Sequence, residues 1–294
     1  MRWARLYFAV QAITGAAWWC AVFAVPVVRD LTLGSLHPVA VAVFDVPLFV
    51  VASAIAAFGV KPAAFVATGW TTLVAIGLAV YATVTTEAGW GVLLMAAAVG
   101  GSLAALSLMA LGRIPTELII AGPFAFKQAR IESRHVLVTA AQVVVFWGLF
   151  LGVGPLAIVF FERRWHLDLA FPGFVVWVGL VVLVLASALG IWSAITMSTL
   201  GKGTPLPSAM ANQLVIAGPY RFVRNPMAVA GIVQGAAIGL LISSWLVVVY
   251  AVLGSLLWNY AVRPLEEANL EERFGVEYGR YRDSVRCWIP RRLW

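Results

Sequence analysis

The chain has 294 residues, of which 62% are hydrophobic and only 11% are charged, and its formal net charge is +7. A soluble globular domain carries roughly a quarter of charged residues, so this composition excludes the soluble class and indicates a membrane protein. The basic excess does not indicate nucleic-acid binding, because Lys and Arg are spread over several short loops and one tail without forming a basic domain.

Apolar runs rich in Ala, Leu and Val recur along the chain. A membrane-spanning helix needs about 20 predominantly apolar residues, and lipid otherwise tolerates only a closed barrel. These runs therefore predict an all-α, polytopic transmembrane helical bundle. We expect about eight spans, near residues 5–27, 38–60, 63–85, 89–112, 134–160, 171–199, 226–242 and 245–262.

The last two spans are short, because Ser243 and Ser244 interrupt the final apolar stretch. We expect residues 226–262 to form a tight helical hairpin, since a single helix of that length would far overshoot a hydrocarbon core of about 30 Å. Residues 262–292 then mix glutamates, arginines and apolar residues at helical spacing. That pattern predicts an amphipathic helix at the cytoplasmic surface.

The basic residues predict an orientation for this bundle. With the N-terminus inside, 17 of the 20 Lys and Arg residues fall on the inner side, and only Arg29, Arg163 and Arg164 fall outside. Cytoplasmic loops carry such an excess, so we expect both termini to be cytoplasmic and the lipid bilayer, with its anionic headgroups, to be a partner. The Ala- and Val-rich composition suggests a bacterial cytoplasmic membrane.

Cysteine and histidine indicate no metal site. Cys20 falls inside the first span and Cys287 in the tail, which favours neither a disulfide framework nor a cysteine-based centre. His37, His135 and His166 are scattered without the spacing of metal ligands, and we expect them to be interfacial or capping residues.

Two regions differ in character along the chain. Residues 1–112 form four spans with short linkers and an unknown role, whereas in residues 113–294 the loops become long and charged. We expect the catalytic or binding site to lie in the second region. "LIIAGPFAF" at 118–126 matches "LVIAGPYRF" at 214–222 at six of nine positions, which fits either a duplication or chance similarity between two loops.

The second of these two similar segments is followed by "RNP" at residues 224–226. Pro226 suits the first position of a helix, where its missing N–H costs nothing, and Asn225 would then be the N-cap. Free backbone N–H groups and the positive end of the helix dipole would lie beside Arg221 and Arg224. Such a helix start is suited to bind a carboxylate or a phosphate.

Five motifs follow one another in the last third of the chain: "GKGTP" from residue 201, "NQLVIAGPYRFVRNP" from 212, "RPLEE" from 263, "FGVEYGRY" from 274 and "WIPR" from 288. Their order resembles the isoprenylcysteine carboxyl methyltransferase and phospholipid methyltransferase superfamily. The resemblance covers residues 200–292 and implies an integral membrane enzyme that uses S-adenosylmethionine and releases S-adenosylhomocysteine. It further implies a cofactor pocket between the membrane core and a C-terminal helix.

The matched motifs carry the family's pocket residues over to this chain. Tyr220 matches a tyrosine that lines the pocket, Glu266 matches the acidic residue that holds the polar end of the cofactor, and Asn225 stands where histidine is commoner. At Ala228 the family usually has tyrosine. The resemblance implies a cofactor-binding set of Asn212, Gln213, Leu214, Val215, Gly218, Tyr220, Asn225, Pro226, Met227, Ala228 and Glu266.

Three further residues are the catalytic candidates. Methyl transfer from a sulfonium is an in-line displacement that positioning and desolvation can promote without a metal or a nucleophilic side chain. Arg224 or Arg263 could orient a carboxylate acceptor, and Glu267 is the best base for an amine or a thiol.

The sequence thus predicts a membrane methyltransferase that acts on a lipophilic, isoprenoid or lipid-like acceptor. Two other classes stay open. A non-catalytic lipid-binding or transport protein would explain the N-terminal spans, although Asp45 is nearly the only ionisable residue inside a span. A membrane reductase of the steroid reductase type would bind NADPH instead of S-adenosylmethionine.

Overall fold

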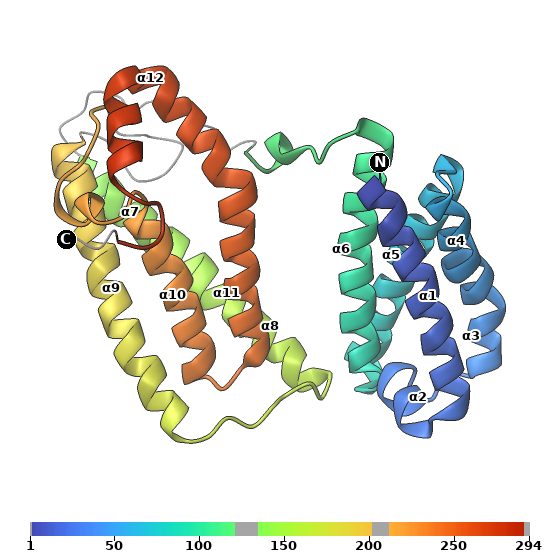
Figure 1. The fold of residues 1–294 in the computed structure, drawn as a ribbon. Helices are drawn as coiled ribbons and strands as arrows, with labels where there is room; N and C mark the ends of the chain where they lie inside the picture. Colours follow the sequence, from blue (N-terminus) through green and yellow to red (C-terminus); the bar gives the residue numbers. More distant parts are fainter. Residues whose placement is uncertain (1, 121–134, 202–211, 291–294) are drawn as a thin grey trace. The chain divides into compact units, whose positions relative to one another are not determined.

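A computed structural model describes residues 2–120, 135–201 and 212–290, and within these ranges every regular element is helical and none is a strand (Figure 1). The loop at 202–211, which holds most of the "GKGTP" motif, lies outside the described residues. Residues 121–126, which belong to the first of the two similar segments, also lie outside the described residues.

The chain divides into two compact units, which we describe separately: residues 1–115 with 161–167, and residues 116–160 with 168–294. The helices of the first part of the chain are α1 (Arg2–Ala24), α2 (Pro26–Thr32), α3 (Pro38–Asp45), the π-helical η1 (Val46–Val51), α4 (Ala52–Ala57), α5 (Lys61–Thr85) and α6 (Gly89–Leu111). There follow η2 (Thr116–Ile120), α7 (His135–Trp147), η4 (Gly148–Val153), α8 (Gly154–Arg164), α9 (Phe174–Leu200), η6 (Gly218–Arg221), α10 (Pro226–Leu241), α11 (Trp245–Leu257), η7 (Trp258–Val262) and α12 (Arg263–Ser284).

Among the described residues, seven helices are long and apolar enough to cross a membrane. This confirms the predicted all-α bundle of an integral membrane protein. The seventh expected span, α10, has 16 residues and is shorter than the others, at about 24 Å. The first span ends earlier than expected, at Ala24, because Pro26 disfavours helical backbone at Val25.

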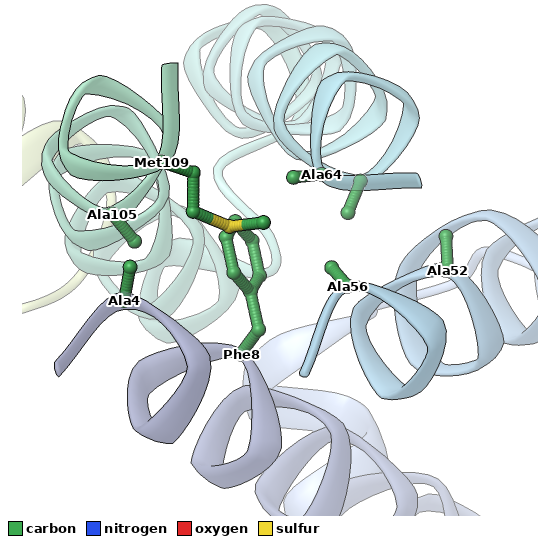
Figure 2. Close-up of a cluster of buried hydrophobic side chains, with 8 residues drawn as sticks. Ala4, Phe8, Ala52, Ala56, Ala64, Ala105 and Met109 are labelled. Atoms are coloured by element: carbon green, nitrogen blue, oxygen red, sulfur yellow. The ribbon is translucent and has the colours of Figure 1, made fainter. Parts of the chain in front are cut away.

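Small residues hold the first unit together. Ala4, Ala56 and Ala105 lie where α1, α4 and α6 approach one another, and Phe8 and Met109 fill the space between them (Figure 2). Lipid tails are as apolar as these side chains, so helices in a bilayer associate mainly through close packing and interhelical hydrogen bonds. Gln11 supplies two such bonds, because its Nε2 donates to Ser53 and its Oε1 accepts from Ser102.

Residues 161–167 pack with the first unit by capping the end of α5. Arg164 donates from Nε to the Thr83 carbonyl at 2.6 Å and from Nη2 to the Val84 carbonyl at 3.0 Å. The last carbonyls of a helix have no partner within the helix, so the guanidinium satisfies groups that would otherwise need water. Gly89 permits this contact, since a Cβ there would lie 2.1 Å from the carbonyl oxygen of Trp165.

Glycine likewise allows the helices of the second unit to approach closely. A Cβ at Gly239 on α10 would lie 2.8 Å from the backbone nitrogen of Val248 on α11, and one at Gly179 on α9 would lie 3.0 Å from the carbonyl oxygen of Ala237. Gln234 on α10 donates to Ser187 on α9 at 2.9 Å. Helices α9, α10 and α11 therefore form one tightly packed layer, which fixes the position of the start of α10.

The expected hairpin is present between α10 and α11. Ser243 adopts a left-handed φ of 52°, the Ser244 N–H donates to the Gly239 carbonyl, and the Ser244 hydroxyl caps α11 by accepting from Val247. Beyond Leu257 the helix continues through η7 into α12 as far as Gly275, where α12 kinks. The stretch from 245 to 274 is about 45 Å long, more than the hydrocarbon thickness of about 30 Å, and the ten charged residues of α12 confine its apolar part to 245–262.

Helix α12 bends back on itself at Gly275, where φ is 49° and ψ is −123° (Figure 1). Only glycine adopts such a conformation without strain. The bend returns the second half of α12 toward α10. That the outer face of α12 lies on the membrane surface stays a prediction.

Candidate functional site

The site is built on the N-terminus of α10. Asn225 is its N-cap, as expected: its Oδ1 accepts from the Ala228 N–H at 3.2 Å, and Pro226 occupies the first turn. The cap leaves the Asn225 amide free to donate from Nδ2 to Glu266 Oε2 at 3.1 Å. One asparagine thus fixes both the start of α10 and the side chain of a glutamate on α12.

The adjacent glutamate on α12 pairs with arginine. Glu267 Oε1 lies 2.7 Å from Arg224 Nη2 and 3.8 Å from Arg263 Nε. Only 14% of the Arg224 side chain and 23% of the Glu267 side chain are exposed, so their ion pair is shielded from water. The expected candidates Arg224, Arg263 and Glu267 are therefore brought together, next to Asn225 and Glu266.

Arg224 is also engaged with the chain that follows α12. Its Nη1 donates to the carbonyls of Arg282 at 3.0 Å and Val285 at 2.8 Å, and its backbone N–H donates to the Arg286 carbonyl at 2.9 Å. These bonds tie the end of α12 to the start of α10. Within the described residues, the buried Nε of Arg224 has no hydrogen-bond partner, so one donor of this guanidinium is unsatisfied.

Glu266 is in a different electrostatic state from Glu267. Burial, together with the neighbouring Glu267 charge, raises the pKa of Glu266 to about 7, and the hydrogen bond from Asn225 offsets only part of this increase. Within the described part of the chain Glu266 forms no ion pair, whereas Glu267 has two arginine partners. A partly buried carboxylate without a counterion is suited to bind a cationic group.

Three buried tyrosines pack together near the glutamate pair. Tyr220, in η6, is 5% exposed, and its carbonyl accepts a 2.6 Å hydrogen bond from the hydroxyl of Tyr281. Tyr278 is 2% exposed and contacts Tyr281 edge to face. Burial, with Glu266 as the nearest charge, raises the pKa of Tyr220, so its hydroxyl stays protonated.

The remaining expected cofactor residues lie on the segment that joins α9 to α10. The backbone N–H groups of Asn212 and Gln213 donate to the carbonyl of Gly201 at 2.7 and 3.1 Å. Val215 is buried, Leu214 is half-buried and Gln213 is exposed. Gly218 has a φ of +55° and lies against α9, where a Cβ would meet Thr196 Oγ1 at 2.8 Å. Met227 and Ala228 lie in the first turn of α10.

The sequence analysis included "FGVEYGRY" and "WIPR" among the motifs but assigned no site role to the segment after α12 or to the two tyrosines in the second half of α12. Trp288 donates from Nε1 to Asn259 on η7 at 2.9 Å, and Cys287 is buried against Arg224 and Arg263, while burial raises the pKa of its thiol. Tyr278 and Tyr281 are three residues apart in "FGVEYGRY". That spacing places two aromatic rings on one helix face and was the available signal.

Together, the fold and the site define an all-helical membrane protein with a charged site at a helix start. Residues 174–277, about a third of the chain, match the family model of phospholipid methyltransferase. The match confirms the resemblance to the superfamily of integral membrane methyltransferases and contains α9, α10, α11 and most of α12. No curated protein and no solved structure matches the chain.

Proposed function

We propose that the protein is an S-adenosylmethionine-dependent membrane methyltransferase whose acceptor is a lipophilic molecule taken from the bilayer. The observation that carries this proposal is Glu266, a carboxylate without a counterion beside the N-terminus of α10, inside the segment that matches a methyltransferase family. A helix start and a carboxylate that can accept a cation complement the carboxylate and the positive groups of a zwitterionic sulfonium cofactor.

The residues present fit S-adenosylmethionine. Its ammonium and sulfonium carry positive charge, for which Glu266 is the one glutamate of the pair without an arginine. Its carboxylate needs donors, which the buried Nε of Arg224 and the Met227 N–H in the first turn of α10 supply. Its adenine and ribose need a largely apolar wall, for which Tyr220 and Val215 are buried candidates.

When bound, S-adenosylmethionine supplies a methyl group on a positively charged sulfur. The residues of the chain act by binding and positioning: Glu266 holds the positive end, and Tyr220 with Tyr281 excludes water from the same side. Arg224 orients Glu267 and fixes α12 against α10. For an amine or thiol acceptor, Glu267 accepts the proton; for a carboxylate acceptor, Arg263 orients it.

The surface of the second unit supports an acceptor that arrives through lipid. Large apolar side chains on α9 and α11 are exposed along the helices, among them Trp177 at 69% and Leu253 at 59%. Such a surface is stable only in contact with lipid tails or with another apolar molecule. A lipophilic acceptor can therefore diffuse to the site without leaving the membrane.

The test is calorimetric binding of S-adenosylmethionine and S-adenosylhomocysteine to detergent-purified protein, with NADPH measured in parallel. Glu266→Ala should abolish binding, whereas Glu272→Ala, which removes an exposed carboxylate from the same helix, should leave it unchanged. Label transfer from methyl-labelled S-adenosylmethionine to a membrane lipid extract then identifies the acceptor class. Binding of NADPH alone would overturn the proposal.

A further inference from the structure

The first unit contains a cavity of about 830 Å³. This volume lies within the range of small-molecule binding sites, roughly 300–1,000 Å³. The wall is mostly apolar and aromatic and is contributed by α1, the end of α2 with residues 33–37, α3, η1, α5 and α6. Its aromatic residues are Tyr7, Trp18, Phe44, Phe49, Trp70 and Tyr81.

One carboxylate lies in this wall, within a helix long enough to span the membrane. Asp45, the last residue of α3, is 5% exposed, and it accepts hydrogen bonds from the indole N–H groups of Trp19 at 2.9 Å and Trp70 at 2.8 Å. Each carboxylate oxygen receives one bond and keeps capacity for a second. A carboxylate inside a membrane span is costly, so its presence marks a function.

The backbone next to Asp45 is also unusual. The π-helical turn η1 begins at Val46, with Pro47 in its first turn, and interrupts an otherwise regular helix. π-Helical turns are rare and occur frequently at functional sites. Opposite η1, Gly15 on α1 leaves room for Phe49, because a Cβ at Gly15 would lie 2.7 Å from the Phe49 ring.

The cavity has an opening toward the outside of the unit. Phe44, Leu94 and Val10 line the cavity and are also exposed on the surface of the unit, at 61%, 52% and 49%. All three are apolar and lie within helices long enough to span the membrane. A molecule in the hydrocarbon layer can therefore enter from the side, with no passage through water.

We propose that the first unit binds a single-chain amphiphile whose polar group donates a hydrogen bond to Asp45, either a hydroxyl or an ammonium. The hydrocarbon chain lies between the aromatic side chains, and its end projects through the opening. The cavity wall contains no Lys or Arg, and its one histidine, His37, accepts a hydrogen bond at Nδ1 from the Ala40 N–H at the start of α3. A phosphate or carboxylate headgroup would therefore meet Asp45 without a Lys or Arg to compensate the repulsion, which disfavours anionic lipids as the ligand.

Three probes with the same chain separate these chemistries: oleyl alcohol, oleylamine and oleic acid. Binding to the full-length protein in detergent is measured by native mass spectrometry without S-adenosylmethionine, so the result is independent of the proposed catalytic site. We expect the alcohol and the amine to bind at least about tenfold tighter than the acid. Equal binding of all three probes would overturn the proposal.

A matched pair of glycine variants on α5 tests the location. Gly77 lines the cavity and Gly69 does not, and a Cβ at either position meets no atom within 4 Å. Gly77→Leu should fill the cavity and reduce binding of the alcohol at least about tenfold, while Gly69→Leu should bind like the wild type. Unchanged binding by Gly77→Leu would overturn the location.

Asp45→Asn tests the carboxylate itself. The amide keeps the shape of the side chain but removes its charge, so the amine should lose its advantage over the acid. If this variant does not fold, the comparison of the three probes still tests the polar group, and the glycine pair still tests the location.

Discussion

The raised pKa of Glu266 predicts that binding of a cationic cofactor depends on pH. A carboxyl group with a pKa of about 7 is mostly neutral at pH 6 and mostly ionised at pH 8. If only the ionised form binds S-adenosylmethionine, affinity should rise about tenfold between these two values, with a midpoint near 7. A glutamate at its ordinary pKa would produce no change over this interval.

Calorimetry over this pH interval is the assay, with Glu266→Gln as the perturbation. The amide retains the shape and can still accept from Asn225, but it cannot pair with an ammonium, so binding at pH 8 should fall by about 10- to 100-fold. The pH dependence should also disappear. Glu272→Gln, an exposed position on the same helix, is the control and should behave like the wild type. A pH profile that survives in Glu266→Gln would refute the reasoning.

Three further variants follow, of which Arg224→Lys and Gly239→Ala are measured by thermal unfolding in detergent and Asn225→Ser by calorimetric binding over a range of pH. Arg224→Lys should lower the free energy of unfolding by about 2–4 kcal/mol, because a lysine cannot bond to two carbonyls and to Glu267 at the same time. As a control, Arg221→Lys at an exposed position should change the free energy of unfolding by less than about 0.5 kcal/mol. Asn225→Ser should keep the cap of α10 but lose the bond to Glu266, which raises the pKa of that carboxyl further and moves the midpoint of cofactor binding to higher pH. Gly239→Ala should cost about 1–3 kcal/mol, because its Cβ would meet backbone of α11, whereas Gly254→Ala, which meets no atom, should stabilise the helix by up to about 1 kcal/mol.

Protonation of Glu266 also affects stability directly. Its pKa is about 7 in the folded protein and ordinarily 4.5, so between these values the folded state holds a proton that the unfolded state has lost. The contribution of Glu266 to the free energy of unfolding is therefore largest below pH 4.5. This contribution, at most about 3 kcal/mol, is lost as the pH rises through 7. Bound S-adenosylmethionine should reverse this loss, because it favours the ionised form.

The helical bundle could be predicted from composition because the requirement that forms it is general. Each apolar run long enough to span lipid must satisfy its own backbone hydrogen bonds, and a helix does this within one segment. The ends of the individual helices depend on local residues. Pro26 ends α1 earlier than expected, and Ser244 caps α11 at the expected start of the last span. The continuation of α11 into α12 was not predictable, because a change from apolar to charged residues does not by itself end a helix.

The site was only partly predictable for a related reason. Asn225 and Pro226 act within a few residues of their own backbone, so the sequence indicated their roles. The partners of Arg224 lie more than 40 residues away along the chain, at Glu267 and Val285, and depend on how α12 bends at Gly275. The sequence identified Arg224 and Glu267 as candidates, but it did not show that Arg224 bonds to the end of α12.

The adjacent residues Glu266 and Glu267 are chemically identical but have different partners. Successive residues on a helix point about 100° apart, so Glu266 meets the cap of α10 while Glu267 meets Arg224. The charge of Glu267 is one cause of the raised pKa of Glu266, which makes the two groups interdependent. Glu267→Gln should therefore lower the pKa of Glu266 and move the midpoint of S-adenosylmethionine binding below 7, without abolishing binding. Calorimetry at several pH values measures that midpoint. An unchanged midpoint would mean that burial alone sets the pKa, and a complete loss of binding would mean that Glu267 itself contacts the cofactor.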